Sequence, residues 1–188
     1  MKVSAILLAA GLSRRMGTDK LMLEYQGKPL VQHSIDLLSK LPVYESIIVT
    51  SNARLKSIAL PPGIWSIINP TPENGQSSSI RIGLEAATGT HYMFMTADQP
   101  KLTPDDIIPL LQVAKENPDK IIYPIIDNKP NSPTIFPEHF RTELLCLSGD
   151  TGGREIRDNN KKSCLALEPE HEKNFKDIDS KEDFDDLF

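Results

Sequence analysis

The chain has few cysteines, few aromatic residues and no excess of basic charge. Its two cysteines, Cys146 and Cys164, stand outside any C-x-x-C or metal-ligand spacing, so we expect reduced thiols and neither a disulfide framework nor a zinc site. Aromatic residues make up 6%, and 21 basic residues face 26 acidic ones. No long stretch is basic, which argues against a nucleic-acid partner.

Long apolar runs are also missing. No run reaches the roughly 18 residues that span a membrane. The short apolar stretch near the N-terminus is followed by arginines and not preceded by them, which disfavours a secretory signal. We therefore expect no membrane partner and a cytoplasmic location. With 39% hydrophobic and 25% charged residues over 188 positions, the composition suits one globular domain covering residues 1–188.

The most informative segment comes first. The run VSAILLAAG, from Val3 to Gly11, breaks into SRRMGTDK over residues 13–20, which predicts a strand that delivers a glycine-bearing cationic loop. Gly11 and Gly17 permit close backbone approach, so N–H groups and side chains can converge on a polyanion, and we expect a nucleoside triphosphate. The cationic side chains are those of Arg14, Arg15 and Lys20.

Two other kinds of loop have a similar composition. Five residues and not four separate Gly11 from Gly17, so the loop is not a Walker A motif. A solvated basic loop after a buried strand is the alternative that residue types alone leave open.

Strand-like runs alternate with helical patterns along the chain. The expected strands are residues 2–8, 46–50, 64–68, 92–96, 121–124, 134–136 and 163–167. The expected helices follow Pro29, begin among residues 77–79, follow a Thr103 cap, run from 138 to 147 and follow a Ser180 cap. This alternation predicts a three-layer α/β/α fold with a mostly parallel, Rossmann-like sheet. Residues 127–133, rich in Asn and Pro, are expected to form a surface loop.

Asp98 directly follows the apolar run YMFMTA and precedes Pro100. Ligands of open α/β sheets bind beyond the carboxyl ends of strands, so its carboxylate should face the same crevice as the loop after Gly11. Mg²⁺ needs one or two carboxylates, with phosphates and waters completing its octahedron, and Asp98 suits that demand. A carboxylate that only caps a turn is the alternative.

Five segments together resemble the nucleotidyltransferases that process the molybdenum cofactor, and most of all the molybdenum cofactor cytidylyltransferases. They are LAAGLSRRMGTDKLMLEYQGKPL (8–30), GQSSSIRIGLEA (75–86), TADQP (96–100), LSGDTGGR (147–154) and DIDSKEDF (177–184). The resemblance covers nearly the whole chain in the family's order. It implies a nucleotide-diphospho-sugar-transferase-like fold, and transfer of CMP from CTP to the terminal phosphate of the molybdenum cofactor (molybdopterin), with release of pyrophosphate.

The same resemblance implies roles for individual residues. The catalytic groups would be Lys20, Arg14, Arg15 and Asp98, with Mg²⁺ on Asp98 and Asp179. The nucleotide would lie against Leu8, Ala9, Ala10, Gly11, Gly75, Ser78 and Ser79, and the acceptor against Asp150 and Arg154. For Asp179, an acid that serves a helix start is the alternative.

Two segments bear on the choice of nucleotide and of acceptor. The family's guanine-specific branch tends to read Leu-Ala-Gly-Gly where this chain has residues 8–11, and the methyl group of Ala10 would crowd a purine, so we expect CTP to be preferred over GTP. Where the cytidylyltransferases have a Gly-His-Pro-like segment, this chain has Asn131, Ser132 and Pro133. A sugar or polyol phosphate is therefore the alternative acceptor.

An alternative from another class is a non-catalytic module that binds nucleotide or cofactor and hands the cofactor to a molybdoenzyme during its maturation. Lys20, Asp98 and Asp179 together favour catalysis, because simple binding would not need the full metal constellation.

Overall fold

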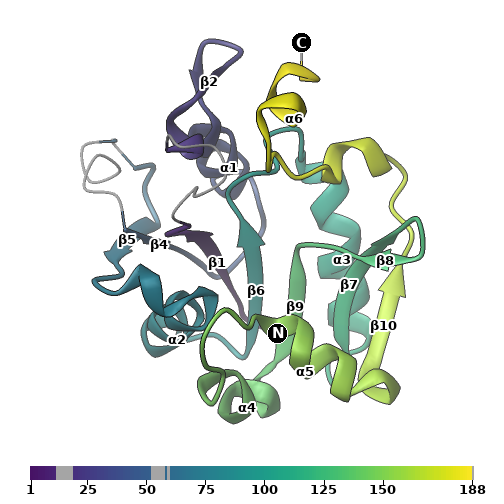
Figure 1. Cartoon of the computed structure of the whole chain (residues 1–188). Coiled ribbons are helices and arrows are strands. Elements are labelled where there is room, and N and C mark those ends of the chain that lie inside the picture. Colours follow the sequence, from purple (N-terminus) through teal and green to yellow (C-terminus); the bar gives the residue numbers. More distant parts are fainter. Residues whose placement is uncertain (12–18, 52–57, 59, 188) are drawn as a thin grey trace.

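A mixed β-sheet runs through the middle of the molecule, in the order β10-β7-β9-β6-β1-β4-β5, with β8 paired to β7 (Figure 1). The computed structural model describes residues 1–11, 19–51, 58 and 60–187. The strands are β1 (Val3–Ala9), β4 (Glu45–Thr50), β5 (Ile64–Ile68), β6 (His91–Thr96), β7 (Ile121–Ile126), β8 (Lys129–Pro130), β9 (Thr134–Pro137) and β10 (Cys164–Leu167). β1 pairs in parallel with β4 and β6, whereas β9 runs antiparallel between β6 and β7.

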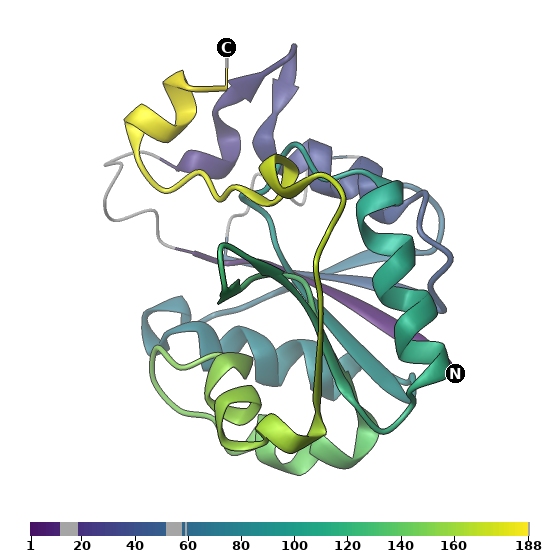
Figure 2. The same cartoon turned by 90° about the vertical axis from the view of Figure 1, so that its right-hand side faces the viewer.

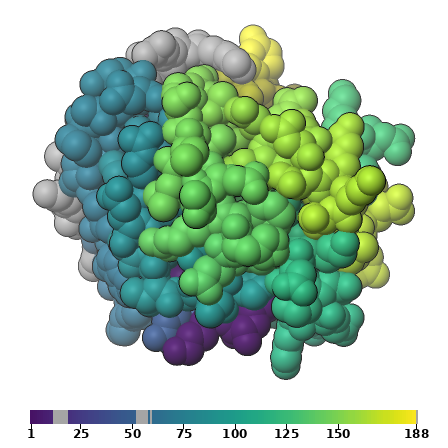
Figure 3. Space-filling model, turned by 90° about the horizontal axis from the view of Figure 1, so that it is seen from below, coloured from purple at the N-terminus to yellow at the C-terminus, as the bar shows by residue number. Residues whose placement is uncertain are grey.

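Helices cover both faces of this sheet, as Figure 2 shows. One layer holds α1 (Leu30–Leu38) and α3 (Pro104–Glu116), and the other holds α2 (Gln76–Ala86), α4 (Arg141–Leu145) and α5 (Gly153–Asn159). In Figure 3 the green segment that carries α4 and α5 lies beside the teal-blue of α2 on the outside of the second layer. The predicted three-layer, mostly parallel α/β/α fold is confirmed.

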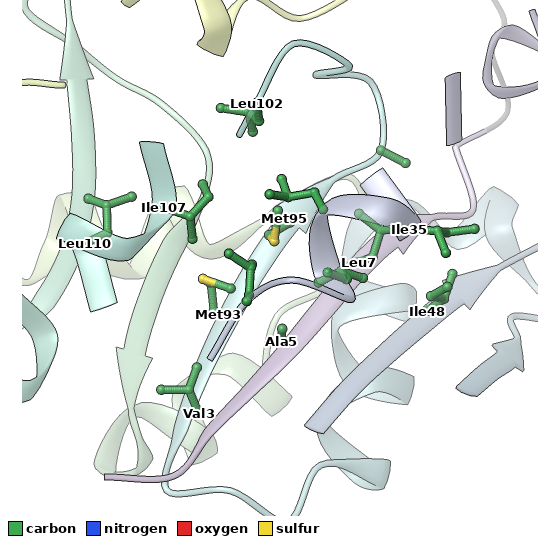
Figure 4. Close-up of a cluster of buried hydrophobic side chains, with 14 of the residues drawn as sticks. Val3, Ala5, Leu7, Ile35, Ile48, Met93, Met95, Leu102, Ile107 and Leu110 are labelled. Carbon is green, nitrogen blue, oxygen red and sulfur yellow. The ribbon is translucent and has the colours of Figure 1, made fainter. Parts of the chain in front are cut away.

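The central strand β1 shows why its sequence is almost continuously apolar. Val3, Ala5 and Leu7 pack toward α1 and α3 (Figure 4), whereas Ile6 belongs to the cluster under α2 and α4. A strand covered on both faces has no polar side, so its residues do not alternate between apolar and polar. Because β1 and β6 pair in parallel, their carboxyl ends lie next to each other at one edge of the sheet.

A small hairpin and the C-terminal segment pack together above that edge. The strands β2 (Glu24–Tyr25) and β3 (Lys28–Pro29) are joined by a two-residue turn in which both residues have positive φ. Tyr25 and Leu30 bury Ile178, with Phe184 of α6 (Lys181–Asp185) packed beside them. This cluster fixes the C-terminal segment over the end of β6, where the Ile178 N–H donates to the Asp98 carbonyl at 2.9 Å.

Both predicted capping boxes are present. Asp106 accepts from the Thr103 N–H at 2.8 Å at the start of α3, and Asp183 accepts from the Ser180 N–H at 3.0 Å at the start of α6. None of the helices in the described ranges is both long and apolar enough to cross a bilayer.

One local prediction holds in part, one was wrong and one helix was missed. The helix expected over 138–147 is a 3₁₀ turn over Glu138–Phe140 followed by the short α4, which the chain leaves before a positive-φ Gly149. Residues 127–133 form a hairpin containing β8 and not a plain loop, because Asp127 and Asn128 adopt φ of 49° and 60°, as a type I′ turn requires. Helix α5 was not predicted, since it is short and opens with glycine, a poor helix former.

Candidate active site

Three charged side chains from distant parts of the chain meet at the carboxyl edge of the sheet. The Lys20 ammonium donates to Asp98 Oδ2 at 2.8 Å, to Asp179 Oδ1 at 3.0 Å and to the Ile178 carbonyl at 2.9 Å. Lys20 opens a 3₁₀ turn, Asp98 follows β6, and Asp179 precedes α6, in the yellow segment that passes over the upper end of β6 in Figure 1. The structure therefore brings together three of the predicted site residues.

The two carboxylates keep Lys20 charged. Burial by itself would lower the pKa of Lys20, but the negative charges and hydrogen bonds of Asp98 and Asp179 outweigh it and raise the pKa above its ordinary value. Only 15% of the Lys20 side chain is exposed, so it is not a solvated surface lysine. The solvated-loop alternative is therefore wrong for Lys20, whereas Arg14 and Arg15 lie outside the described residues.

Neither aspartate serves as a simple cap. Asp98 Oδ1 is buried and makes no hydrogen bond within the described part of the chain, while its other oxygen holds Lys20. The cap of α6 is provided by Ser180 and Asp183, which leaves the Asp179 carboxylate for Lys20. An orphaned carboxylate oxygen beside a second carboxylate is a donor set that suits a hard cation such as Mg²⁺.

The donor set is incomplete for a resident metal. Among the residues that the structure describes, no group of three or more His, Cys, Asp or Glu side chains has metal-binding geometry. A cation on Asp98 and Asp179 would therefore take its remaining ligands from phosphate oxygens and water, as Mg²⁺ commonly does.

Asp177 is a site residue that the sequence reasoning missed. Desolvation raises its pKa to about 7, the charges of Asp98 and Asp179 add to the shift, and Lys20 opposes it. Its position two residues before Asp179 in the segment DIDSKEDF was the available signal, because alternate residues of an extended segment face the same side.

A large cavity of about 950 Å³ opens beside Lys20. Its wall contains most of the residues expected to bind nucleotide or to catalyse, together with one expected at the acceptor: Leu8, Ala10, Gly11, Lys20, Gly75, Ser78, Ser79, Asp98 and Asp150. Among the described residues of these two groups, Ala9 is the exception. Its side chain is 2% exposed and packs into the core on the α1 and α3 side, because neighbouring residues of a strand point to opposite faces.

The serines of this wall shape the loop that precedes α2. Asn69 Nδ2 donates to Ser78 Oγ at 2.8 Å and to Ser79 Oγ at 3.0 Å, and Ser78 Oγ donates to the Gly75 carbonyl at 2.8 Å. Asn69 is buried and was not predicted. The buried serine–asparagine network gives the loop over residues 69–75 a defined shape, so its backbone is preorganised on the cavity wall.

Gly75 is required at the end of this loop. Its φ is +83°, and a Cβ there would lie 2.6 Å from the Asp150 nitrogen. The backbone of residues 149–150 thus packs directly against the start of α2, where the Ser77 hydroxyl donates to the Gly149 carbonyl at 2.7 Å. Asp150 is held beside the candidate nucleotide residues by this contact.

A small cavity of about 370 Å³ adjoins the large one, and Leu8, Gln76, Thr96 and Asp98 line both. Asp179, Asp177, Arg154 and the unpredicted Arg157 line the small cavity, together with Ile80, Phe94 and Phe136. The two residues expected to bind the acceptor are therefore divided, with Asp150 on the large cavity and Arg154 on the small one. The Arg154 side chain is 83% exposed and pairs with Asp158 at 3.5 Å.

Several sequence relatives carry nucleotidyltransferase names. A probable molybdenum cofactor guanylyltransferase of Rhodopirellula baltica is 32% identical over 123 residues, which are 62% of this chain and 58% of that protein. Two further proteins with that name are matched over 54% and 60% of their length, so the chain spans less than two thirds of these relatives. The purine catabolism protein PucB of Bacillus subtilis is 28% identical, covering 96% of this chain and 93% of its own.

Solved structures share the fold. The crystal structure of Rv0371c from Mycobacterium tuberculosis superposes with a TM-score of 0.82 at 21% identity, covering all of this chain and 97% of that one. Another crystal structure of Rv0371c is a complex with manganese. The sequence model of the MobA-like NTP transferase domain matches residues 5–164. With most of its length covered by that match, and with Lys20, Asp98 and Asp179 gathered at the edge of the sheet, the chain belongs to the MobA-like NTP transferase domain family.

Proposed function

We propose that the protein is a Mg²⁺-dependent nucleotidyltransferase that transfers CMP from CTP to the terminal phosphate of the molybdenum cofactor and releases pyrophosphate. The observation that carries this proposal is the Lys20 ammonium between Asp98 and Asp179, at the junction of two adjoining cavities. The large cavity would hold the nucleotide and the small cavity the acceptor. Asp98 lines both, so the nucleotidyl group would be transferred beside it. The relatives named molybdenum cofactor guanylyltransferases support the reaction class and the acceptor.

The reaction requires no strong base. A phosphate monoester has a second pKa near 6, so the acceptor is largely dianionic at pH 7. Its oxygen attacks the α-phosphorus of CTP, a new P–O bond forms, and the bond to the β-phosphate oxygen breaks to release pyrophosphate. Both reactants are anionic, and the rate therefore depends on positioning and on neutralisation of charge.

The described residues supply part of that neutralisation. Lys20 and Arg81 are the cations that the described residues place on the wall of the large cavity, and the attachment of Lys20 to two segments fixes the direction in which its charge acts. Asp98 and Asp179 would hold Mg²⁺, which screens the phosphate oxygens when bound. We assign Gly11, Gly75, Ser78 and Ser79 to the nucleotide, because they line the same cavity as Lys20.

The preference for CTP rests on Ala10. This residue is 5% exposed and lines the large cavity, and we infer that its methyl group would meet the base. The molybdenum cofactor is favoured as acceptor over a sugar or polyol phosphate by the names of the relatives. Asn131 and Ser132, which replace the expected Gly-His segment, line the small cavity, where the acceptor would lie.

A nucleotide panel tests the proposal. Purified protein with Mg²⁺ and molybdopterin is given CTP, GTP, ATP or UTP, and release of pyrophosphate is measured. We expect CTP to be used about 10- to 200-fold better than GTP, as steric discrimination of this size allows. Equal or better turnover with GTP overturns the cytidylyl assignment and leaves nucleotidyl transfer standing. Binding of CTP without release of pyrophosphate, with every acceptor, would favour the binding module.

A further inference from the structure

We propose that Arg157 binds the end of the acceptor that lies opposite its reacting phosphate, and that the acceptor is a long molecule and not a three-carbon or similarly short phosphate. This role of Arg157 rests on the proposed function, because it places the acceptor in the small cavity. Nothing in the sequence singled out Arg157.

Arg157 is a buried cation with an open donor. Its side chain is 7% exposed, and its Nε and Nη2 both donate to Asp158 Oδ1 at 3.1 Å. Its guanidinium lies 5.0 Å from the centre of the Tyr123 ring. In the part of the chain that the structure describes, Nη1 has no hydrogen-bond partner, and Arg157 lines the small cavity. A guanidinium that is mostly buried on a cavity wall, with one nitrogen that donates to none of the described residues, can donate to an oxygen of a molecule bound there.

The packing of α5 places Arg157 there. A Cβ on Gly153 would lie 2.7 Å from Phe136 Cζ, and a Cβ on Gly152 would collide with Gln76 Oε1. The Gln76 side chain could turn away, but Phe136 is fully buried in the core, so the glycine at 153 lets α5 approach the sheet closely. Arg157 follows Gly153 by four residues and therefore lies on the same face of the helix, toward the sheet. The stacking on Tyr123 then fixes the guanidinium plane.

The order of the strands separates Arg157 from the reacting end. Tyr123, under the guanidinium, belongs to β7, whereas Asp98 follows β6, and β9 lies between these two strands. Two strand spacings of about 4.8 Å separate β7 from β6 by roughly 10 Å, and we infer a comparable distance between the guanidinium and the Asp98 carboxylate. A phosphate near Asp98 and a group on Arg157 can belong to one molecule only if that molecule spans this distance.

The wall between the two ends suggests the body of that molecule. Ile80, Phe94 and Phe136 line the small cavity and present apolar surface, while Asn131 and Ser132 line it with polar groups. A flat, fused-ring body with oxygen atoms at its far end fits this arrangement. The planar guanidinium prefers carbonyl, carboxylate or phosphate oxygens, which such an end would offer.

Three variants test this role. Arg157→Met removes the charge and the donor, and Arg157→Lys keeps the charge. Arg141→Met is the matched control, because the Arg141 guanidinium also stacks on a tyrosine, 5.3 Å from the Tyr92 ring centre, and lines neither cavity. For each, KM for molybdopterin, KM for CTP and kcat are measured, along with direct binding of molybdopterin by its pterin fluorescence.

Loss of a hydrogen bond from a charged donor predicts a KM for molybdopterin about 10- to 100-fold higher in Arg157→Met. The KM for CTP and the kcat at saturating acceptor should change less than about twofold, since Arg157 lies away from the reacting atoms. Arg157→Lys should show a smaller increase, and Arg141→Met none. If Arg157→Met does not fold, the Arg157→Lys result decides alone, and an unchanged KM in it overturns the proposal.

Short acceptors separate this role from the proposed function. Any transfer to glycerol 3-phosphate should be insensitive to Arg157→Met, because that molecule cannot reach Arg157 from Asp98. If the wild-type protein releases no pyrophosphate yet binds molybdopterin, and Arg157→Met weakens that binding, the proposed function fails and the role of Arg157 stands. If transfer proceeds and the Arg157 and Arg141 variants have the same KM for molybdopterin, the role of Arg157 fails and the function stands. Failure of the wild-type protein to bind molybdopterin also overturns the role of Arg157.

Discussion

The Lys20 ammonium lies 2.8 Å from Asp98 Oδ2, although 78 positions separate the two residues along the chain. The same ammonium holds Asp179, which comes from the other end of the sequence. A cation between two carboxylates relieves their mutual repulsion, and Asp98 Oδ1 is left without a partner in the described structure. This pairing gives Lys20 and Asp98 distinct experimental signatures.

Replacing Lys20 should lower turnover without unfolding the protein. We expect Lys20→Ala to reduce kcat by about 10²- to 10³-fold, since a fixed charge that acts on the transferring phosphate is lost. Lys120→Ala is the control, because the Lys120 ammonium donates a hydrogen bond to the Lys162 carbonyl and Lys120 lines neither cavity. Steady-state release of pyrophosphate measures the effect. Wild-type kinetics in Lys20→Ala would show that Lys20 only ties segments together.

Asp98→Asn separates a metal-binding role from a structural one. The amide keeps the size of the side chain but removes the charge, and turnover should fall at least about 10²-fold, or roughly 2.7 kcal/mol of transition-state stabilisation. Affinity for CTP without metal should stay unchanged or tighten, because one negative charge near the phosphates has gone. Calorimetry measures the CTP affinity, and thermal unfolding measures the melting temperature. The control variant is Asp36→Asn, because the Asp36 carboxylate also pairs with a lysine, Lys28. A folded Asp98→Asn protein with normal Mg²⁺-dependent turnover contradicts the metal role.

Two glycines with the same φ angle but different surroundings allow a comparison. Gly75 and Gly63 both have φ of +83°, but a Cβ on Gly75 would collide with the backbone of residues 149–150, whereas a Cβ on Gly63 meets nothing within 4 Å. Gly63→Ala should cost about 1–2 kcal/mol of unfolding free energy from the backbone angle alone. Gly75→Ala should cost more and should weaken CTP binding. Urea denaturation measures the unfolding free energy and titration measures the CTP affinity. If the two variants lose the same stability and affinity, the contact of residue 75 with residues 149–150 has no effect of its own.

Ala10→Gly should shift the choice of base. Removing the methyl group from the wall of the large cavity makes room for a purine, so the ratio of kcat/KM for GTP to that for CTP should rise several-fold or more, within the roughly 10- to 200-fold that one such contact provides. Ala9→Gly is the control, since Ala9 packs into the core. An unchanged ratio in Ala10→Gly would mean that other residues select the base.

His91 should make folding stability depend on pH. Burial lowers the pKa of His91 below 6.5, although its Nε2 lies 2.9 Å from the Pro118 carbonyl. The unfolded chain then binds the proton more readily than the folded one, so the stability that the neutral ring contributes is present above pH 6.5 and is lost as the pH falls below it. Urea unfolding at pH 7.5 and 5.5 should show the loss, and His91→Gln should reduce it. If the change in unfolding free energy between pH 7.5 and 5.5 is the same in His91→Gln, the pH dependence comes from other groups.

Much of the fold could be predicted from the sequence, because strands and helix starts depend on residues that are close together in the chain. The apolar runs of β1 and β6 and the capping boxes at Thr103 and Ser180 each depend on residues within a few positions of one another. Helix α5 and the β8 hairpin were missed for the same reason, since a helix opening with glycine and a short turn carry weak local signals. Both lie close to the small cavity.

The sequence by itself determined the α/β alternation, the strand ends that carry Gly11 and Asp98, and the candidacy of Lys20 and Asp179. Only the tertiary structure decided that Lys20 bridges the two aspartates, that Ala9 faces the core and not the cavity, and that Asp150 and Arg154 line different cavities. It alone brought Asn69, Asp177 and Arg157 to the site. Asp177 had a local signal in its spacing from Asp179, whereas Arg157 reaches the small cavity through the packing of α5, and Asn69 reaches the large-cavity wall through its bonds to Ser78 and Ser79. Contacts of these kinds leave no pattern in the sequence around Asn69 or Arg157.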